Sequence, residues 1–299
     1  MAKILTDLTQ SKPKLLVYGN AGTGKTRLVG SAALYEPTAP AFMLTIGGNP
    51  VSLQDYERKP VVVAVEQTSD FNDIYDWFYL GQPITHPVAK VLDDKGLLTD
   101  KGLTNFATLI VDGGTMVNEK YWRIITGKPE NERADFANVG DGKPIDPGKY
   151  RDNIATMTYW GGLYFGLADY ANTYPVNVMM TALESIPATD YRSQAAKSAG
   201  ASPPPEYTQR TRPAFIGQAS GALESMAYIV CRMTPTVRFG LVEAKKLGLW
   251  DATKRQLAGW NVACFGPDAD FVAKDQYGRL GSYMLDPTIE QIWQKLFAV

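Results

Sequence analysis

The sequence contains few of the side chains that build zinc sites and nucleophilic triads. Its 299 residues include one histidine, His86, and two cysteines, Cys231 and Cys264. These three residues are too few for a standard Cys/His zinc site and do not supply a Ser-His-Asp triad. A disulfide between two cysteines is also not expected in a reducing compartment. The composition therefore argues against a zinc module and a triad hydrolase.

Long apolar runs are missing as well. Residues 1–14 have no apolar stretch of signal-peptide length, and no later run approaches the roughly 18 residues of a membrane helix. We therefore expect a cytoplasmic protein with no membrane partner. Its 30 basic and 31 acidic residues give a formal net charge of -1, so any contact with nucleic acid must use a local patch.

Short apolar runs alternate with helical segments through the first two thirds of the chain. The predicted strands are residues 14–18, 41–46, 61–65, 108–111 and 176–181. The predicted helices are residues 26–35, 71–79, 116–125 and 153–171. This alternation is typical of an α/β fold with a mostly parallel sheet flanked by helices.

The later part of the chain has a different texture. Residues 185–213 contain five prolines and indicate a long loop, and residues 127–149 indicate an insertion. A helix is expected at 215–226, followed by two antiparallel strands, 227–233 and 236–243, with Thr234 and Pro235 at their turn. We expect residues 1–243 to form the core. Residues 244–299 are expected to be a C-terminal extension packed on it.

The first predicted strand leads into a glycine-rich motif. The pattern G-x-x-x-x-G-K-[ST] is matched at every position by Gly19, Asn20, Ala21, Gly22, Thr23, Gly24, Lys25 and Thr26. Glycines let backbone N–H groups approach phosphate oxygens, and the helix that follows adds its positive N-terminal end. Lys25 is expected to reach the β- and γ-phosphates, and the Thr26 hydroxyl to ligate Mg²⁺. The motif therefore predicts a P-loop that binds a nucleoside triphosphate, ATP with Mg²⁺.

A second motif is an apolar strand that leads into a carboxylate. The predicted strand 108–111 is followed directly by Asp112, as in a Walker B strand. Asp112 would then hold Mg²⁺ through a water molecule. An aspartate at this place is also a common cap of the next helix, and Gly113 and Gly114 before a helix fit that alternative. The presence of Lys25 and Thr26 favours the metal role.

Taken together, these features resemble the phage-encoded RecA-like P-loop NTPases, and among them the Sak-type single-strand annealing proteins. The resemblance spans about residues 12–280 and includes the strand 176–181 with the Ala-Leu-Glu that follows it, and the late Ala273-Lys274-Asp275. It implies a RecA-like core, a ring or filament of identical subunits, and single-stranded DNA as the partner in DNA recombination in the host cytoplasm. The sequence leaves open whether the C-terminal extension, with its tryptophans, docks on a further partner such as a single-strand binding protein.

The chain departs from this family where a water-activating glutamate is expected. The strand after the P-loop helix usually ends with acidic residues before a Gly-Gly pair, but here Ile46 precedes Gly47 and Gly48. Glu66, at the end of the next strand, is the alternative general base, or else an exposed residue before a helix. We therefore expect ATP binding, with ATP as an assembly switch and slow or absent hydrolysis.

Two further positions correspond to functional places in the family. Thr181, followed by Glu184, matches a polar sensor of the γ-phosphate, or simply ends its strand. Lys274 opens a Lys-Asp-Gln-Tyr-Gly-Arg segment that resembles the element through which RadA relatives reach a neighbouring subunit's nucleotide. Gln276 stands there in place of an arginine. A plain surface turn is the alternative for Lys274.

The long loop occupies the place where RecA-type proteins hold single-stranded DNA. It carries four basic residues against two acidic ones, together with aromatic rings on which bases could stack. The candidate DNA-binding residues are Tyr191, Arg192, Lys197, Tyr207, Arg210 and Arg212. A solvated proline-rich loop has the same composition and remains the alternative.

Two other functions compete with DNA recombination. One is a P-loop enzyme, either a helicase-like or packaging motor ATPase or a nucleotide kinase, which requires a water-activating carboxylate or a substrate lid. Neither is evident in the sequence. The other is a nonenzymatic, structural nucleotide-binding protein, which the missing glutamate favours.

Overall fold

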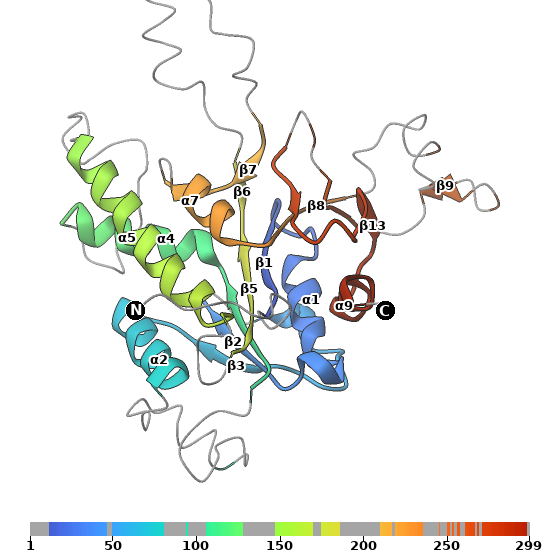
Figure 1. The fold of residues 1–299 in the computed structure, drawn as a ribbon, viewed down its shortest axis with the longest axis horizontal. Coiled ribbons are helices and arrows are strands. Elements are labelled where there is room, and N and C mark those ends of the chain that lie inside the picture. Colours follow the sequence, from blue (N-terminus) through green and yellow to red (C-terminus); the bar gives the residue numbers. More distant parts are fainter. Residues whose placement is uncertain are drawn as a thin grey trace, which may run out of the picture.

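The chain forms an α/β fold around a nine-stranded sheet that is mostly parallel (Figure 1). The computed structural model describes residues 12–46, 50–80, 94, 106–127, 147–169, 175–185, 210–216, 219–235, 245, 250–251, 253, 256–257, 261–266, 268 and 271–297. All statements below concern these residues.

The strands of the main sheet lie in the order β13-β11-β8-β1-β5-β4-β2-β3, and β12 also pairs with β8. The neighbours from β8 to β3 are parallel, whereas β11, β12 and β13 are antiparallel additions. Their bounds are β1 Lys14–Tyr18, β2 Ala41–Thr45, β3 Val61–Ala64, β4 Thr108–Asp112, β5 Asn177–Ala182, β8 Ile229–Pro235, β11 Asn261–Cys264, β12 Lys274–Asp275 and β13 Tyr283–Leu285.

Helices cover both faces of the sheet. The α-helices are α1 Lys25–Gly30, α2 Thr68–Leu80, α4 Gly114–Ile125, α5 Pro147–Gly166, α7 Ala219–Met226 and α9 Ile289–Phe297. Short 3₁₀ helices are η1 Ser31–Ala33, η2 Glu36–Thr38 and η3 Val51–Leu53. Two small antiparallel pairs complete the fold, β6 Glu184–Ser185 with β7 Arg212–Pro213, and β9 Trp250–Asp251 with β10 Gln256–Leu257.

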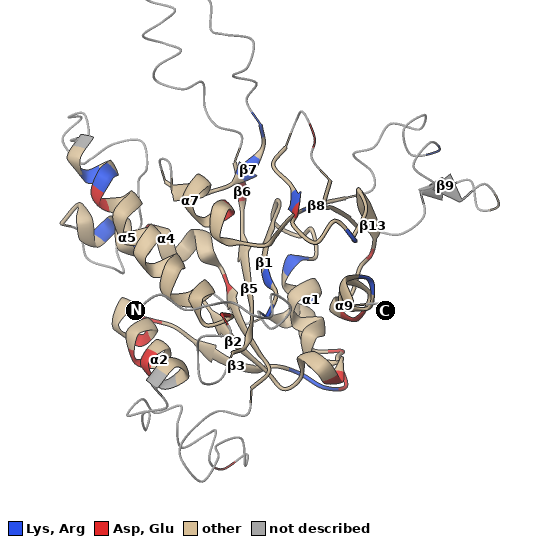
Figure 2. Cartoon of the chain, in the orientation of Figure 1, with Lys and Arg blue, Asp and Glu red and all other residues tan. Residues whose placement is uncertain are grey.

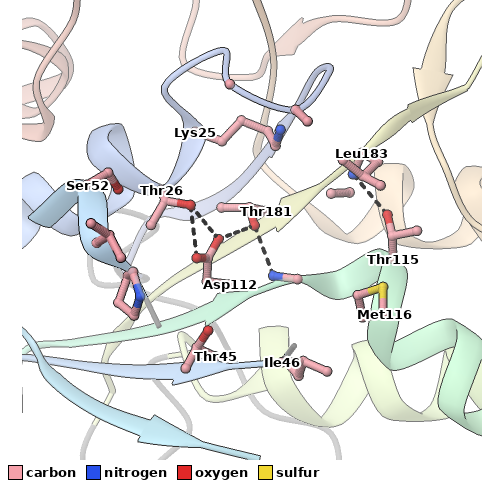
Figure 3. A pocket seen from close by; sticks show the side chains of 16 residues that line it. Lys25, Thr26, Thr45, Ile46, Ser52, Asp112, Thr115, Met116, Thr181 and Leu183 are labelled. Carbon is pink, nitrogen blue, oxygen red and sulfur yellow. Dashed lines mark hydrogen bonds between the residues drawn. The ribbon is translucent and has the colours of Figure 1, made fainter. Parts of the chain in front are cut away.

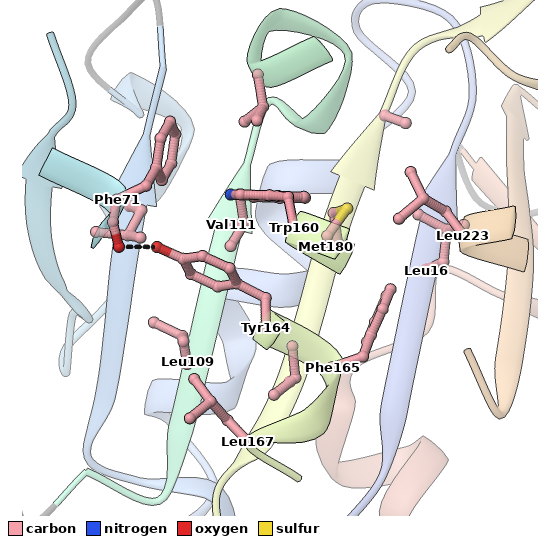
Figure 4. Packing of buried hydrophobic residues seen from close by; sticks show 14 of the residues in the cluster. Leu16, Phe71, Leu109, Val111, Trp160, Tyr164, Phe165, Leu167, Met180 and Leu223 are labelled. Carbon is pink, nitrogen blue, oxygen red and sulfur yellow. Dashed lines mark hydrogen bonds between the residues drawn. The ribbon is translucent and has the colours of Figure 1, made fainter. Parts of the chain in front are cut away.

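The central strands are apolar on both faces because helices bury each of them. Along β1, Leu16 and Tyr18 belong to the cluster under α2, α4, α5 and α7, whereas Leu15 and Val17 belong to the cluster under α1 and α9. Figure 4 shows the first cluster, in which the buried Tyr164 hydroxyl of α5 donates a hydrogen bond of 2.8 Å to a carbonyl of α2. Two hydrophobic layers therefore hold one sheet.

The direction of the connections explains which helix covers which face. The chain runs from β1 through α1 to β2 on one side, and then back from β4 through β5 to β8 with α4, α5 and α7 on the opposite face (Figure 1). Right-handed crossovers produce this arrangement whenever the direction of travel reverses. The neighbouring strands β1 and β5 therefore have connections that leave them in opposite directions across the sheet. Ligands of open α/β sheets bind beyond the carboxyl ends of the strands at such a point.

The C-terminal part of the chain enters the same core. Strands β11 and β12 pair with β8, and α9 packs on the face of α1 through residues spaced as an amphipathic helix requires: Ile289, Ile292, Trp293 and Leu296. A reciprocal cap between Thr288 and Gln291 begins α9, and the Ile289 N–H donates to the Ser31 hydroxyl at 2.8 Å. Strands β11, β12 and β13 thus continue the main sheet.

The structure confirms, to within one residue, the predicted strands 14–18, 41–46, 61–65, 108–111 and 176–181. The mostly parallel sheet is also confirmed, and the antiparallel strands β11, β12 and β13 make it a mixed sheet. The turn at Thr234 and Pro235 is wrong, because both residues belong to β8 and face Val262 and Asn261 of β11. The second strand of that hairpin, 236–243, lies outside the described residues.

The predicted helices occur, with shifted ends. The first α-helix stops at Gly30 and continues as η1, and α5 begins at Pro147, inside the expected insertion. The helix expected at 215–226 begins at Ala219. Residues 184–185 and 212–213, at the ends of the expected loop, pair as β6 and β7. No helix within the described ranges is long and apolar enough to span a membrane.

We predict that Ile292→Ala lowers the free energy of unfolding by about 2–5 kcal/mol, because a fully buried aliphatic side chain of α9 is lost. Denaturant unfolding followed by tryptophan fluorescence measures the change. The control Gln294→Ala alters the exposed face of the same helix and should change stability by less than about 0.5 kcal/mol. Equal stability of the two variants would mean that α9 is peripheral to the fold.

Candidate functional site

A pocket of about 360 Å³ lies at the carboxyl ends of the central strands (Figure 3). Its walls are the loop after β1, the first turn of α1, the ends of β2, β4 and β5, the start of α4, and η3. This is the edge of the sheet where the connections reverse direction, so the fold itself predicts a ligand site here.

The strand register places three polar side chains on one wall of the pocket. Side chains alternate between the faces of a strand, and Met43, Ile110 and Met179 all belong to the cluster on the α1 face. Two residues further along each strand are Thr45 of β2, Asp112 of β4 and Thr181 of β5, which line the pocket.

The loop after β1 has the close turns that its glycines allow. Gly24 has a φ of 81°, a left-handed conformation that favours glycine, and a Cβ atom on Gly19 would clash with the Met233 carbonyl of β8. The Thr23 hydroxyl donates to the Asn20 carbonyl at 2.8 Å and closes the turn between them. The loop is therefore held by its own hydrogen bonds and by β8.

Lys25 provides the positive charge of the pocket. Its amine donates to the carbonyl oxygens of Gly19 and Asn20 at 2.8 and 2.7 Å, so the side chain folds back over the loop. Burial lowers the pKa of Lys25 from its ordinary value, while the carboxylates of Asp112 and Glu184 oppose that shift. A partly desolvated ammonium group at the mouth of a loop is suited to bind an anion.

Asp112 receives hydrogen bonds from two threonines (Figure 3). The Thr26 hydroxyl lies 3.1 Å from Oδ1 and 2.9 Å from Oδ2, and the Thr181 hydroxyl donates to Oδ1 at 2.6 Å. The Thr181 oxygen also accepts the Gly113 N–H at 3.0 Å. The structure therefore brings together Thr26, Asp112 and Thr181, which the sequence placed in one site.

The alternative role of Asp112 as a helix cap is wrong. The N-cap of α4 is Gly113, which has a φ of 112° and supports no side-chain capping bond. Gly114 then packs so closely on β5 that a Cβ atom would lie 2.9 Å from the Thr181 carbonyl oxygen. The two glycines let the chain turn tightly into α4, which leaves the Asp112 carboxylate facing Thr26.

An ion pair that the sequence did not reveal lies beside the pocket. Arg232 of β8 donates from Nε to Glu184 at 3.0 Å, and the side chains are only 15% and 7% exposed. The guanidinium also lies over the Phe271 ring. Glu184 was expected beside Thr181, but nothing local in the sequence marks Arg232. Its place follows from pairing of β8 with β1, which sets Arg232 opposite Tyr18.

The pocket wall continues into the β6–β7 pair. Leu183 lines the pocket, its N–H donates to the Thr115 hydroxyl at 2.9 Å, and its carbonyl accepts the Ala214 N–H at 2.8 Å. On the α4 side, Asn118 accepts the Ile216 N–H. Both ends of the segment between β6 and β7 are thus attached at the edge of the pocket.

Of the candidate DNA-binding residues, Tyr191, Arg192, Lys197 and Tyr207 lie outside the described residues. Arg210 is exposed just before β7. Figure 2 colours Lys or Arg positions at and beside this strand blue. Arg212 makes a two-point ion pair with Glu224 of α7, at 2.9 and 3.2 Å. Arg212 therefore already has a carboxylate partner, while Arg210 faces solvent.

The structure does not bring the two catalytic candidates into the pocket of their own chain. Glu66 follows β3 and is exposed, and Asp70 of α2 accepts its backbone N–H at 3.0 Å. Lys274 of β12 donates to the carbonyls of Glu224 and Ser225 at the end of α7, and burial lowers its pKa. Neither side chain is among those that line the pocket.

A comparison with models of known protein families found no match to this chain, and a comparison with curated proteins found none either. The interpretation of the site therefore rests on its own geometry.

We predict that Gly114→Ala destabilises the protein by about 1–3 kcal/mol, because the added methyl group meets the Thr181 carbonyl and the Met180 sulfur atom at 2.9 and 3.0 Å. The matched control is Gly162→Ala in α5, where a Cβ atom meets nothing within 4 Å. That change should stabilise the helix by about 0.5–1 kcal/mol. Denaturant unfolding measures both. A stable Gly114→Ala protein would contradict the close packing of α4 on β5.

Proposed function

We propose that the protein binds ATP with Mg²⁺ and that nucleotide occupancy controls its assembly on single-stranded DNA. The observation that carries the nucleotide part is the convergence of Lys25, Thr26 and Asp112 at the carboxyl ends of β1 and β4. These three side chains are the cation, the hydroxyl and the carboxylate that P-loop proteins use for phosphates and their metal ion.

The residues present fit a magnesium ion. Mg²⁺ prefers oxygen ligands and is usually held by one or two carboxylates together with substrate phosphates and waters. The Thr26 hydroxyl and the Asp112 carboxylate lie 2.9 Å apart and supply such oxygens. A bound Mg²⁺ ion neutralises phosphate charge. Thr26 would be its direct ligand, and Asp112 would hold one of its waters.

The pocket favours binding over fast hydrolysis. Among the lining residues that the structure describes, Asp112 is the only carboxylate, and on the β2 side the wall is formed by Thr45, Ile46, Pro50, Val51 and Ser52. Activation of water requires a base within hydrogen-bond reach of the attacking molecule. In the proposed function, ATP therefore acts as a switch and is hydrolysed slowly at most.

The DNA part of the proposal rests on the resemblance to RecA-like annealing proteins and on where the candidate segment is attached. Its two ends are paired as β6 and β7, directly beside Leu183 of the pocket. A ligand that changes the hydrogen bonds of Leu183 in the pocket wall therefore also affects the paired strands β6 and β7, the stems of this segment. We propose that the segment binds single-stranded DNA, and that the oligomer, a ring or filament, anneals or pairs the strands.

We predict that Lys25→Ala weakens binding of a fluorescent ATP analogue at least about 30-fold, equivalent to about 2 kcal/mol, because a half-buried cation on the phosphates is lost. Fluorescence titration with Mg²⁺ present measures the affinity, and circular dichroism checks the fold. The control Lys295→Ala removes a lysine of α9 that contacts the Leu280 carbonyl and should bind as the wild type does. Unchanged affinity in Lys25→Ala would overturn the proposed nucleotide site.

We also predict that ATP and Mg²⁺ strengthen binding of an oligo(dT) strand, measured by fluorescence anisotropy. The affinity should fall steeply with salt, because each phosphate contact releases counterions and contributes about -0.7 to the log-log slope. The variant Arg210→Ala should bind more weakly, whereas Arg58→Ala, which changes another exposed arginine just before β3, is the matched control. If DNA binding does not depend on the nucleotide, or if no DNA binding is detected, the recombination proposal is refuted. A structural nucleotide-binding protein is then the remaining interpretation.

Phosphate release measured in the same samples separates the proposal from a motor ATPase. We expect slow release, and we expect Glu66→Gln to leave it unchanged because Glu66 does not line the pocket. The exposed Glu57→Gln variant is the control. Rapid release that Glu66→Gln alone abolishes would identify Glu66 as the base and favour the motor.

A further inference from the structure

The hydrogen bonds of Thr181 leave it no hydrogen for a phosphate. A threonine hydroxyl has one hydrogen and two lone pairs. In Thr181 the hydrogen goes to Asp112 Oδ1 at 2.6 Å, and a lone pair accepts the Gly113 N–H at 3.0 Å. The residue is only 2% exposed. A direct contact from this hydroxyl to a γ-phosphate would require the Thr181–Asp112 bond to break.

The same bond fixes the orientation of the carboxylate. Oδ1 of Asp112 lies within hydrogen-bond distance of both Thr181 and Thr26, while Oδ2 faces Thr26 at 2.9 Å. Rotation of the carboxylate away from this plane would break the short bond to β5. Because the Gly113 N–H also binds the Thr181 oxygen, the backbone that follows Asp112 is tied to the same hydroxyl.

We infer that Thr181 is a positioning residue that holds the Asp112 carboxylate toward the divalent cation, and that it does not sense the γ-phosphate itself. This inference rests on the proposed Mg²⁺–nucleotide function. Outer partners that orient a metal-binding side chain commonly change metal affinity about 10–100-fold. Thr181 is the corresponding partner of Asp112, supplied by a strand that lies between β1 and β4.

The test compares Thr181→Val, which keeps the shape and loses the hydroxyl, with Thr181→Ser, which keeps the hydroxyl. Binding of fluorescent ATP and ADP analogues is titrated with Mg²⁺, and also measured in EDTA. For Thr181→Val we expect the Mg²⁺ concentration at half-effect to rise about 10-fold or more. Its ratio of ATP to ADP affinity in EDTA should stay within about twofold of the wild type, a difference of about 0.4 kcal/mol. Thr181→Ser should restore the Mg²⁺ response.

The outcomes separate this inference from the proposed function. No nucleotide binding by the wild type, or binding that Mg²⁺ does not affect, would refute the proposed function. Normal Mg²⁺ dependence in Thr181→Val with a lost preference for ATP over ADP would overturn the inference and restore the γ-phosphate sensor. Thr181→Val also leaves the Gly113 N–H without its acceptor, so unfolding curves of Thr181→Val and Thr181→Ser show whether a changed Mg²⁺ response comes with a loss of stability.

Discussion

The Asp112 carboxylate joins parts of the chain that are far apart in the sequence. Thr26 lies 86 residues before it and Thr181 lies 69 residues after it, yet both hydroxyls reach the same group. A carboxylate that is partly removed from water needs such partners, since an unpaired one is costly. The hydrogen bonds also demand one particular register of β4 against β5. A shift by one residue would turn Thr181 to the opposite face of the sheet.

The hydrogen bonds of Asp112, rather than the packing of the apolar core, determine the geometry of the site. The strands that carry the site are buried on both faces. Hydrophobic packing alone would tolerate other apolar side chains of similar volume at these positions. The polar strand residues that line the pocket lie at or next to the carboxyl ends of their strands. There the register, the two glycines after Asp112 and the loop closed by Thr23 fix the positions of the side chains. Packing builds the sheet, and hydrogen bonds at its edge select the geometry of the pocket.

The parts of the site that follow from local sequence were predicted. The P-loop pattern and the apolar strand ending on Asp112 are each contained in a few consecutive residues. Arg232 was missed because only the pairing of β8 with β1 brings it near the pocket. The turn assigned to Thr234 and Pro235 failed for a related reason. A Thr-Pro pair is a local turn signal, but β8 continues through it to pair with β11, which lies in a distant part of the chain.

The electrostatics of the pocket connect its occupancy to the stability of the fold. Burial lowers the pKa of Lys25, which means that its ammonium form is held at a cost that Asp112 and Glu184 offset only in part. A bound phosphate would bring opposite charge to this ammonium and relieve that cost. A ligand that binds only the folded chain stabilises it in proportion to the logarithm of its concentration. Since Leu183 joins the pocket wall to β6 and β7, such stabilisation acts on the stems of the candidate DNA-binding segment without any need for hydrolysis.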